Sequence, residues 1–522
     1  MSRTYTGLRF NFICVFGFIS LSLNVATCFI HVNNLKGRRG EGYYVEAEVG
    51  TPPQKLNILV DTGSSNLAVA GTAHPLVDAY FRSERSRTYV TKNENVGVPY
   101  TQGCWDGKLG SDMVSIPSLR NLVPVRCDIA SILTSRNFYV NGSQWQGILG
   151  LAYPSISRPS SHILSWLEAV SYVSGHNVSQ YHFRSLPLPF SLELCGPYNE
   201  DLDHYGNFFV GDALSMPGPD VPQWVLSPIV KDDFYELLLT GMELGGNAIN
   251  LPCEEFNNEK TIVDSGTTKL KLPNKVFQEL MDLFQRILSE KGRGETVEFW
   301  EQQKTICWKQ GSEWEERQWL ESFPNLTLSL AHTPYFSNGF NPKTNQFYLS
   351  EMEYPFPIKS YFNLELTSKS YIRKINQNIY PSPLPRQNEN CYQFAIEASE
   401  TGTVLGIVVM EGLNVMFNQT GRVVGFAESP CGPEVRIYGP FPLEFDSTPC
   451  APIVKSEPVN PVAMGVYLFG GMIAALLTTV GLRMLYLACQ RMWITFRLRY
   501  LYLLLPSKKK SSSVVNLVTP EI

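Results

Sequence analysis

Apolar and polar residues alternate along much of the first 450 residues, as in the segment from Tyr44 to Val49. A period of two residues is typical of β-strands with one buried face. Turn-forming clusters such as Thr51-Pro52-Pro53 separate these segments about every ten residues. Helical periodicity is rare, and its clearest case runs from Lys275 to Lys291, where apolar residues recur on one helical face. The pattern predicts a mostly β protein with few helices.

Two long apolar runs lie near the ends of the chain. Residues 10–25 follow a short basic start, which predicts a signal peptide over residues 1–28, with a retained anchor as the alternative. The uncharged run 459–482 is long enough to cross a hydrocarbon core of about 30 Å. Basic residues are frequent in the following segment, 483–522, and we therefore expect a cytosolic tail and type I, single-pass topology.

Between these runs we expect a luminal region built of several parts. Residues 29–41 are expected to form a short pro-segment or N-terminal extension, and the basic stretch Lys36–Arg39 is either a processing site or a solvated charge run. Two β-rich lobes are expected over residues 42–190 and 191–450, followed by a juxtamembrane linker, 451–458. Residues 331–363 lack a sustained period and are interpreted as a long surface insertion.

One short motif occurs twice, as Asp61-Thr62-Gly63-Ser64-Ser65 and as Asp264-Ser265-Gly266-Thr267-Thr268. Each copy follows an apolar, β-branched run, so each Asp is expected at the end of a buried strand. Glycine allows a sharp turn next to each acid, at Gly63 and at Gly266. The hydroxyls of Ser64 and Thr267 are placed to donate hydrogen bonds to the two carboxylates. Each turn is thus predicted to hold one carboxylate.

If the two turns meet, Asp61 and Asp264 cannot both ionise easily and would share one proton. One carboxylate would then take a proton from water while the other donates one to a peptide carbonyl oxygen. This pair predicts amide hydrolysis without a metal ion or other cofactor, with greatest activity at mildly acidic pH. The expected partners are protein or peptide substrates.

Several other functions are disfavoured by the sequence. A net charge of −5 over 522 residues gives no reason to expect nucleic-acid binding. The chain contains neither a Gly-x-Ser-x-Gly nucleophile motif nor a nucleotide-binding Gly-Lys-Ser/Thr loop. No zinc-type Cys-x-x-Cys or His-Glu-x-x-His spacing occurs, and no metal ligands are expected.

The duplicated motif resembles the catalytic motifs of the pepsin-like aspartic proteases, which are mostly β and bilobal, with one catalytic Asp in each lobe. Further similarity lies in Gly147-Ile148-Leu149-Gly150-Leu151 and in Val404-Leu405-Gly406-Ile407-Val408. The sequences Asn66–Thr72 and Met410-Glu411-Gly412 are similar to those of the membrane-anchored memapsin, or beta-secretase, branch of the family. Tyr100-Thr101-Gln102-Gly103 resembles the flap of that family, and Trp105 is placed to hydrogen-bond the Tyr100 phenol.

Eleven cysteines are present, and the oxidising lumen makes disulfides the default for those in the luminal region. Spacing alone leaves the connectivity open. The memapsin resemblance implies three pairs: Cys195 with Cys431, Cys253 with Cys450, and Cys307 with Cys391. Cys104 and Cys127 depart from the family pattern, and either a fourth disulfide between them or two free thiols is compatible with the sequence.

The resemblance implies a membrane-embedded endopeptidase that sheds ectodomains by cleaving extended segments of single-pass or secretory-pathway proteins, amyloid-precursor-like type I proteins among them. Golgi, endosome or cell surface is the implied location. The alternative is an inactive protein of the same fold that serves as a binding or sorting receptor. Four sequons predict N-glycosylation, at Asn141, Asn177, Asn325 and Asn418.

Overall fold

A computed structural model of the chain divides into two compact units, residues 1–453 and residues 454–522, which are described separately. The residues that the structure describes are 34–38, 42–100, 103–139, 144–174, 187–197, 203–211, 223–292, 297–300, 305–334, 340–341, 346–347, 358–375, 389–443, 450 and 461–504. The predicted signal peptide, the linker 451–458 and the tail beyond 504 lie outside these residues, as do Arg39, Asn141 and Asn177.

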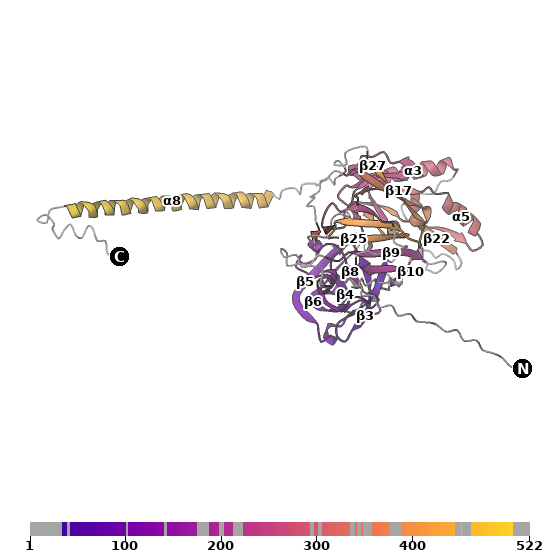
Figure 1. Ribbon diagram of the computed structural model, residues 1–522, viewed down its shortest axis with the longest axis horizontal. Helices are drawn as coiled ribbons and strands as arrows, with labels where there is room; N and C mark the ends of the chain where they lie inside the picture. The colour runs from indigo at the N-terminus through magenta and orange to yellow at the C-terminus, as the bar shows by residue number, and fades with distance from the viewer. Residues whose placement is uncertain are drawn as a thin grey trace, which may run out of the picture. The chain divides into compact units, whose positions relative to one another are not determined.

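The first unit is mostly β, as predicted, and its largest sheet has thirteen strands in the order β11-β26-β25-β9-β10-β1-β2-β3-β8-β4-β7-β6-β5 (Figure 1). The strands in the N-terminal part of the chain are β1 (Leu35–Arg38), β2 (Tyr43–Val49), β3 (Gln54–Asp61), β4 (Leu67–Ala70), β5 (Val90–Tyr100), β6 (Gly103–Ser115), β7 (Val125–Arg136) and β8 (Gly147–Gly150). The remaining strands of this sheet are β9 (Phe190–Pro197), β10 (Asp203–Val210), β11 (Val225–Pro228), β25 (Leu413–Asn418) and β26 (Val423–Glu428).

Four smaller sheets complete the unit. The five-stranded sheet contains β12 (Leu239–Leu244), β13 (Asn247–Ala248), β17 (Leu326–His332), β20 (Ser360–Leu366) and β27 (Val435–Pro442). The four-stranded sheet contains β14 (Thr261–Val263), β15 (Leu270–Pro273), β23 (Ile396–Ser399) and β24 (Thr403–Leu405). The others are β16 (Ile306–Lys309) with β21 (Ile372–Lys374) and β22 (Glu389–Phe394), and the pair β18 (Phe340–Asn341) and β19 (Gln346–Phe347).

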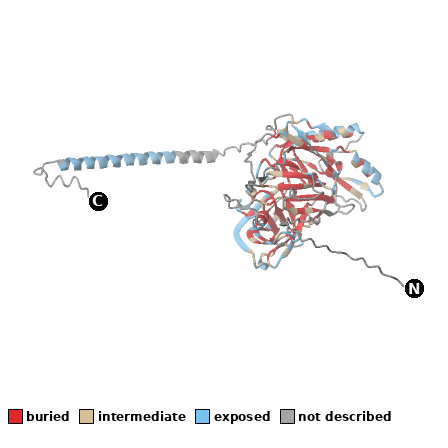
Figure 2. Cartoon of the chain, viewed as in Figure 1, coloured by how far each residue is buried: buried red, intermediate tan, exposed pale blue. Residues whose placement is uncertain are grey.

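Helices are short within the first unit. They are η1 (Ser83–Arg85), η2 (Pro154–Ile156), α1 (Trp166–Val173), α2 (Cys253–Phe256), α3 (Asn274–Glu290), α4 (Val297–Trp300), α5 (Glu313–Glu321), α6 (Ser368–Tyr371) and α7 (Ile407–Met410). The longest, α3, covers the segment in which the apolar period predicts a helix, and it buries Leu280, Met281 and Phe284. A large hydrophobic cluster runs through the sheets of the unit, and a second, smaller cluster packs around Trp105. Figure 2 shows the buried segments in red.

Strand β1 lies inside the large sheet, between β10 and β2. Its Leu35 is fully buried and pairs with Gly206, while Lys36 is exposed. The part of segment 29–41 that the structure describes is therefore an integral strand.

The interpretation of residues 331–363 as a surface insertion is wrong at both ends of the segment. Ala331 pairs with Tyr361 and His332 pairs with Ser360, because β17 and β20 are antiparallel neighbours in the five-stranded sheet. Ala331 and Phe362 are fully buried. Each end contributes too few residues to show a period, so its strand character could not be recognised. Most of the stretch between β17 and β20 lies outside the described residues.

The three disulfides implied by the resemblance are present: Cys195–Cys431, Cys253–Cys450 and Cys307–Cys391. The suggested pair Cys104–Cys127 is not formed, and both cysteines carry free thiols. They do lie on neighbouring strands, β6 and β7, but the register places Cys104 opposite Arg136 and Cys127 opposite Asp112. Eight strand positions separate the two sites, a distance of about 26 Å, so no bridge can form.

The second unit contains one helix of 44 residues, α8 (Pro461–Leu504). By length and composition, its segment Met472–Leu501 is apolar enough to cross a membrane. A single helix thus covers residues 461–482 of the predicted span and the arginine-containing stretch after it. At about 66 Å it exceeds the thickness of a hydrocarbon core of about 30 Å.

Candidate active site

The two copies of the duplicated motif occupy equivalent positions in two sheets. Strand β3 ends at Asp61 and pairs in parallel with β8, so that Asp61 lies opposite Gly150. Strand β14 pairs in parallel with β24 and leads directly into Asp264. The backbone fixes both acids, because Asp61 O accepts from Leu151 N (2.8 Å) and Asp264 N donates to Leu405 O (3.1 Å). The glycine-rich segments noted in the sequence are therefore the partners of the two acid-bearing strands.

Each carboxylate is held within its own turn by one amide and one hydroxyl. Asp61 Oδ1 accepts from Gly63 N (2.8 Å), and its Oδ2 accepts from the Ser64 hydroxyl. Asp264 is held in the same way by Gly266 N (2.8 Å) and by Thr267 Oγ1 (2.6 Å). The predicted donors Ser64 and Thr267 are thus in place, and the two carboxyl groups are oriented by matching contacts.

The turns themselves are joined by four hydrogen bonds made by Thr62 and Ser265, the residues that follow the two acids. Thr62 Oγ1 donates to Val263 O (2.9 Å) and accepts from Ser265 N (3.0 Å). Ser265 Oγ donates to Val60 O (2.8 Å) and accepts from Thr62 N (3.1 Å). The sequence analysis assigned no role to these two hydroxyls. Their equivalent position in both copies of the motif was the signal that could have identified them.

The carboxyl groups of Asp61 and Asp264 lie side by side, because a single Cβ atom built on Gly266 would lie 2.3 Å from Asp61 Oδ1 and 3.2 Å from Asp264 Oδ1. Each also lies against the glycine of the opposite turn. A Cβ atom on Gly63 would lie 2.5 Å from Asp264 Oδ1, and one on Gly266 would lie 2.3 Å from Asp61 Oδ1. Neither glycine has a positive φ. Close approach of the opposite carboxyl, rather than the predicted sharp bend, therefore accounts for both glycines.

Burial is the main influence on the protonation of Asp61, which is only 3 % exposed. Loss of hydration raises the pKa of Asp61, and the neighbouring Asp264 carboxyl raises it further, although the Ser64 and Gly63 donors oppose this shift. Asp264 is less buried than Asp61. A pair in this environment favours the state in which the two carboxyls hold one proton between them.

A hairpin formed by β5 and β6 places Tyr100 next to this pair. Trp105 Nε1 donates to Tyr100 Oη (3.2 Å), the contact expected from the sequence, and Trp105 is fully buried. Tyr100 also interacts with Ser64, whose hydroxyl donates to Asp61. Burial and the Asp61 carboxyl raise the pKa of Tyr100, so its phenol remains a neutral hydrogen-bonding group. Residues 101 and 102 of the hairpin lie outside the described part of the chain.

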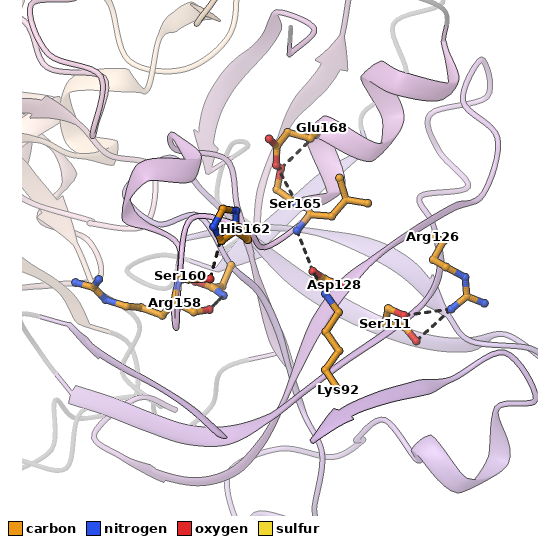
Figure 3. Close-up of polar contacts among 11 residues, drawn as sticks. Lys92, Ser111, Arg126, Asp128, Arg158, Ser160, His162, Ser165 and Glu168 are labelled. Atoms are coloured by element: carbon orange, nitrogen blue, oxygen red, sulfur yellow. Dashed lines mark hydrogen bonds and ion pairs between the residues drawn. The ribbon is translucent and has the colours of Figure 1, made fainter. Parts of the chain in front are cut away.

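The far end of the hairpin is anchored by an ion pair between an exposed lysine and a buried aspartate. Lys92 Nζ on β5 lies 2.6 Å from Asp128 Oδ2 on β7, and Asp128 also accepts from Leu164 N (2.9 Å). Figure 3 shows these contacts beside Ser165 and Glu168, which cap the N-terminus of α1. The base of the hairpin is thereby fixed to the body of the sheet.

The remaining predicted positions do not belong to the pair formed by Asp61 and Asp264. Asn325 is exposed just before β17, and Asn418 is half-buried at the end of β25, where its Oδ1 accepts from Gly421 N (2.6 Å). Glu389 lies near the sulfurs of Cys307 and Cys391, but these sulfurs form a disulfide and offer no thiolate for a metal.

Comparison with known proteins identifies the family. A model described as eukaryotic aspartyl protease matches residues 42–179, and one described as xylanase inhibitor C-terminal matches residues 234–341. The chain is 34 % identical over 443 residues to a beta-secretase of Strongylocentrotus purpuratus, covering 80 % of this chain and 74 % of that protein. The chain belongs to the beta-secretase branch of the pepsin-like aspartic proteases.

More distant similarity extends to other members of the aspartic protease family. Cathepsin E of Mus musculus is 28 % identical over 254 residues, which cover 46 % of this chain and 56 % of that protein. Pepsin-2B of Gadus morhua is 26 % identical over 256 residues, which cover 47 % of this chain and 70 % of that protein. This beta-secretase homologue is therefore an aspartic endopeptidase that acts on proteins or peptides, and the alternative of an inactive receptor gains no support.

Proposed function

We propose that Asp61 and Asp264 are the catalytic residues of this endopeptidase and that they activate a water molecule directly. The observation that carries the proposal is the close approach of the two carboxyls, each held by an amide and a hydroxyl of its own turn. Such a pair supplies an acid and a base at one point. Gly63, Gly266, Ser64 and Thr267 support the pair by shape and by hydrogen bonding.

Asp61 is proposed to carry the shared proton, because burial penalises its charged form and it is the more buried of the two acids. Asp264 then acts as the base. It takes a proton from water while the water oxygen bonds to the scissile carbonyl carbon, and Asp61 gives its proton to the carbonyl oxygen. Transfer of a proton to the departing nitrogen and cleavage of the C–N bond complete hydrolysis.

Tyr100 is proposed to close over the substrate and to exclude bulk water from the reacting groups. Its contacts with Trp105 and with Ser64 link the hairpin to the dyad. An extended substrate would be held by backbone hydrogen bonds and by pockets for alternate side chains, so a broad rather than single-residue preference is expected.

The mechanism requires one protonated carboxyl, and activity is therefore expected to be highest at mildly acidic pH. Above that range the dyad loses its proton and activity falls. A flat profile up to about pH 8 would contradict this mechanism.

The substrates are proposed to be membrane proteins, including single-pass proteins of the type I, amyloid-precursor-like class. The apolar helix α8 supports membrane anchoring. Confinement of enzyme and substrate to one bilayer raises their effective concentration for each other. An acidic optimum and a luminal catalytic unit fit an endosomal or late secretory location, with the N-glycosylated unit on the luminal side.

The test of the mechanism is peptide cleavage by the full-length protein in detergent micelles between about pH 3 and pH 8. Asp61→Asn and Asp264→Asn should each abolish cleavage, while Asp282→Asn, an acid on the surface of α3, should retain it. Retained cleavage in Asp264→Asn would remove the mechanism. The substrate class is tested by comparing ectodomains released from cells that express the wild type or Asp264→Asn. Equal release from both would exclude shedding.

A further inference from the structure

A buried acid lies beside the strand that carries Asp264. Glu236 forms an antiparallel bridge with Ile262, two residues before Asp264, and both residues are almost fully buried. The flanking hydrogen bonds run from Leu237 N to Thr261 O (2.8 Å) and from Val263 N to Tyr235 O (3.2 Å). Residues opposed in this way form a close, non-hydrogen-bonded pair whose side chains share one face. Glu236 therefore stands on the same face of β14 as Ile262.

Lys260 immediately precedes β14 and is two residues from Ile262, so the alternation of side chains along an extended chain places it on the same face. Its Nζ lies 4.0 Å from the centroid of the Phe234 ring, two residues from Glu236. This ammonium group interacts electrostatically with the carboxyls of both Glu236 and Asp264. The lysine thus connects the buried acid to the catalytic pair.

Two further charged groups face Glu236 and Lys260. Lys231 and Asp233 form an ion pair of 2.7 Å in the preceding loop, and both interact with Glu236 and with Lys260. Lys231 is mostly exposed, so its charge is screened by solvent. Within the described part of the chain, neither Glu236 nor Lys260 makes a side-chain hydrogen bond or an ion pair within 4 Å. Their charges are therefore not neutralised by a close partner.

We propose that Glu236 and Lys260 are positioning residues that set the pH range over which Asp61 and Asp264 hold a single proton. The inference rests on the proposed catalytic role of the two aspartates. The positive charge of Lys260 favours the negatively charged, singly protonated state of the Asp61–Asp264 pair and so preserves that state down to lower pH. The charge state of Glu236 sets the strength of the electrostatic effect of Lys260 on the Asp61–Asp264 pair.

Burial raises the pKa of Glu236 from 4.5 to about 7, although Lys231 and Lys260 oppose this shift. At acidic pH Glu236 is neutral and leaves the charge of Lys260 uncompensated. Near neutrality Glu236 ionises and offsets that charge. The Asp61–Asp264 pair therefore retains its last proton up to a higher pH. Lys260 thus acts on both sides of the pH profile, whereas Glu236 acts on the alkaline side alone.

The test measures kcat/KM from pH 3 to 8 for the full-length protein in detergent micelles. The substrate is a fluorogenic peptide without ionisable side chains, selected from a library with the wild type. Lys260→Met should shift both the acidic and the alkaline side of the kcat/KM profile to higher pH, by about half a pH unit or more. Lys260→Arg should retain the wild-type profile. Glu236→Gln should leave the acidic side of the profile unchanged and shift its alkaline side to lower pH.

Lys275→Met is the matched control, because it removes an exposed lysine that pairs with Glu255 on the surface. Its pH profile of kcat/KM should coincide with that of the wild type. A Lys260→Met profile that also coincides with the wild type would overturn the inference, as would equal shifts in Lys260→Met and Lys275→Met. If Glu236→Gln does not fold, the Lys260 variants decide alone. Retained cleavage in Asp264→Asn would instead refute the proposed function.

Discussion

Thr62 and Ser265 are 203 residues apart in the chain, yet each hydroxyl accepts a hydrogen bond from the other residue's backbone amide. Each hydroxyl also donates to a carbonyl of the opposite strand, Val263 or Val60. All of these groups are buried, so their loss is not compensated by water. The separation of the Asp61 and Asp264 carboxyls is therefore fixed by neutral side chains beside them.

Replacing Thr62 by Val should weaken both this link and catalysis. The change removes a buried donor and acceptor and leaves Ser265 N and Val263 O unpaired, which costs about 1–3 kcal/mol. Thermal unfolding and kcat/KM of the full-length protein measure the two effects. Thr62→Ser keeps the hydroxyl and should remain close to wild type. Full activity in Thr62→Val would show that the link does not position the acids.

Gly63→Ala should reduce kcat more strongly than it reduces stability. The new Cβ atom would lie 2.5 Å from Asp264 Oδ1, so the two carboxyls would have to move apart. A displacement of this size at reacting groups lowers the rate by about 100-fold or more. Gly241→Ala is the matched control, because its Cβ would meet no atom closer than 3.7 Å. Equal kcat values in the two variants would contradict the close approach.

Tyr100→Phe should lower kcat/KM by roughly 3-fold to 10-fold, as expected for the loss of one hydrogen bond in the closed site. The phenol accepts from Trp105 and contacts Ser64, whereas the ring packs on Phe138 and would remain in place. Steady-state kinetics on a cleaved peptide measure the change. Tyr438→Phe, in an exposed position on β27, provides the comparison. An unaltered kcat/KM would assign Tyr100 to packing alone.

The stability of the protein should fall as pH rises between about 4.5 and 7, in part because of Glu236. Its folded-state pKa of about 7 lies above the ordinary value of 4.5, so the folded state binds more protons in this window. Raising the pH through the window removes on the order of 3 kcal/mol at most. Glu236→Gln should show a shallower decline of the unfolding midpoint. Parallel declines in variant and wild type would place the titration elsewhere.

The two free thiols should differ in reactivity towards an alkylating reagent under non-reducing conditions. Cys104 is half-exposed and should react in the native protein, whereas Cys127 is fully buried and should react only after unfolding. Burial also raises the pKa of the Cys127 thiol and suppresses its thiolate. Peptide mapping distinguishes the sites. A peptide pair linked through Cys104 and Cys127 would contradict the strand register.

The fold class and the helix α3 were predictable from the sequence because both depend on local periodicity. Alternation over six residues identifies a half-buried strand, and an apolar face repeated over seventeen residues identifies a helix. Local periodicity did not predict strands that are short and that pair with residues distant in the chain. Ala331 and Phe362 belong to neighbouring strands of one sheet, although most of the chain between them gives no regular signal.

For the candidate site, the repeat of Asp-Thr/Ser-Gly with a hydroxyl three residues after each acid determined the two carboxyls and their donors, because these contacts are made within a single turn. Contacts between the turns were decided only by the tertiary structure. Thr62 bonding to Ser265, Gly63 lying against Asp264, and Glu236 opposing Ile262 each join strands that are distant in the chain or in different sheets. Strand register also separated Cys104 from Cys127, because a sequence identifies neighbouring strands without fixing which residues face each other.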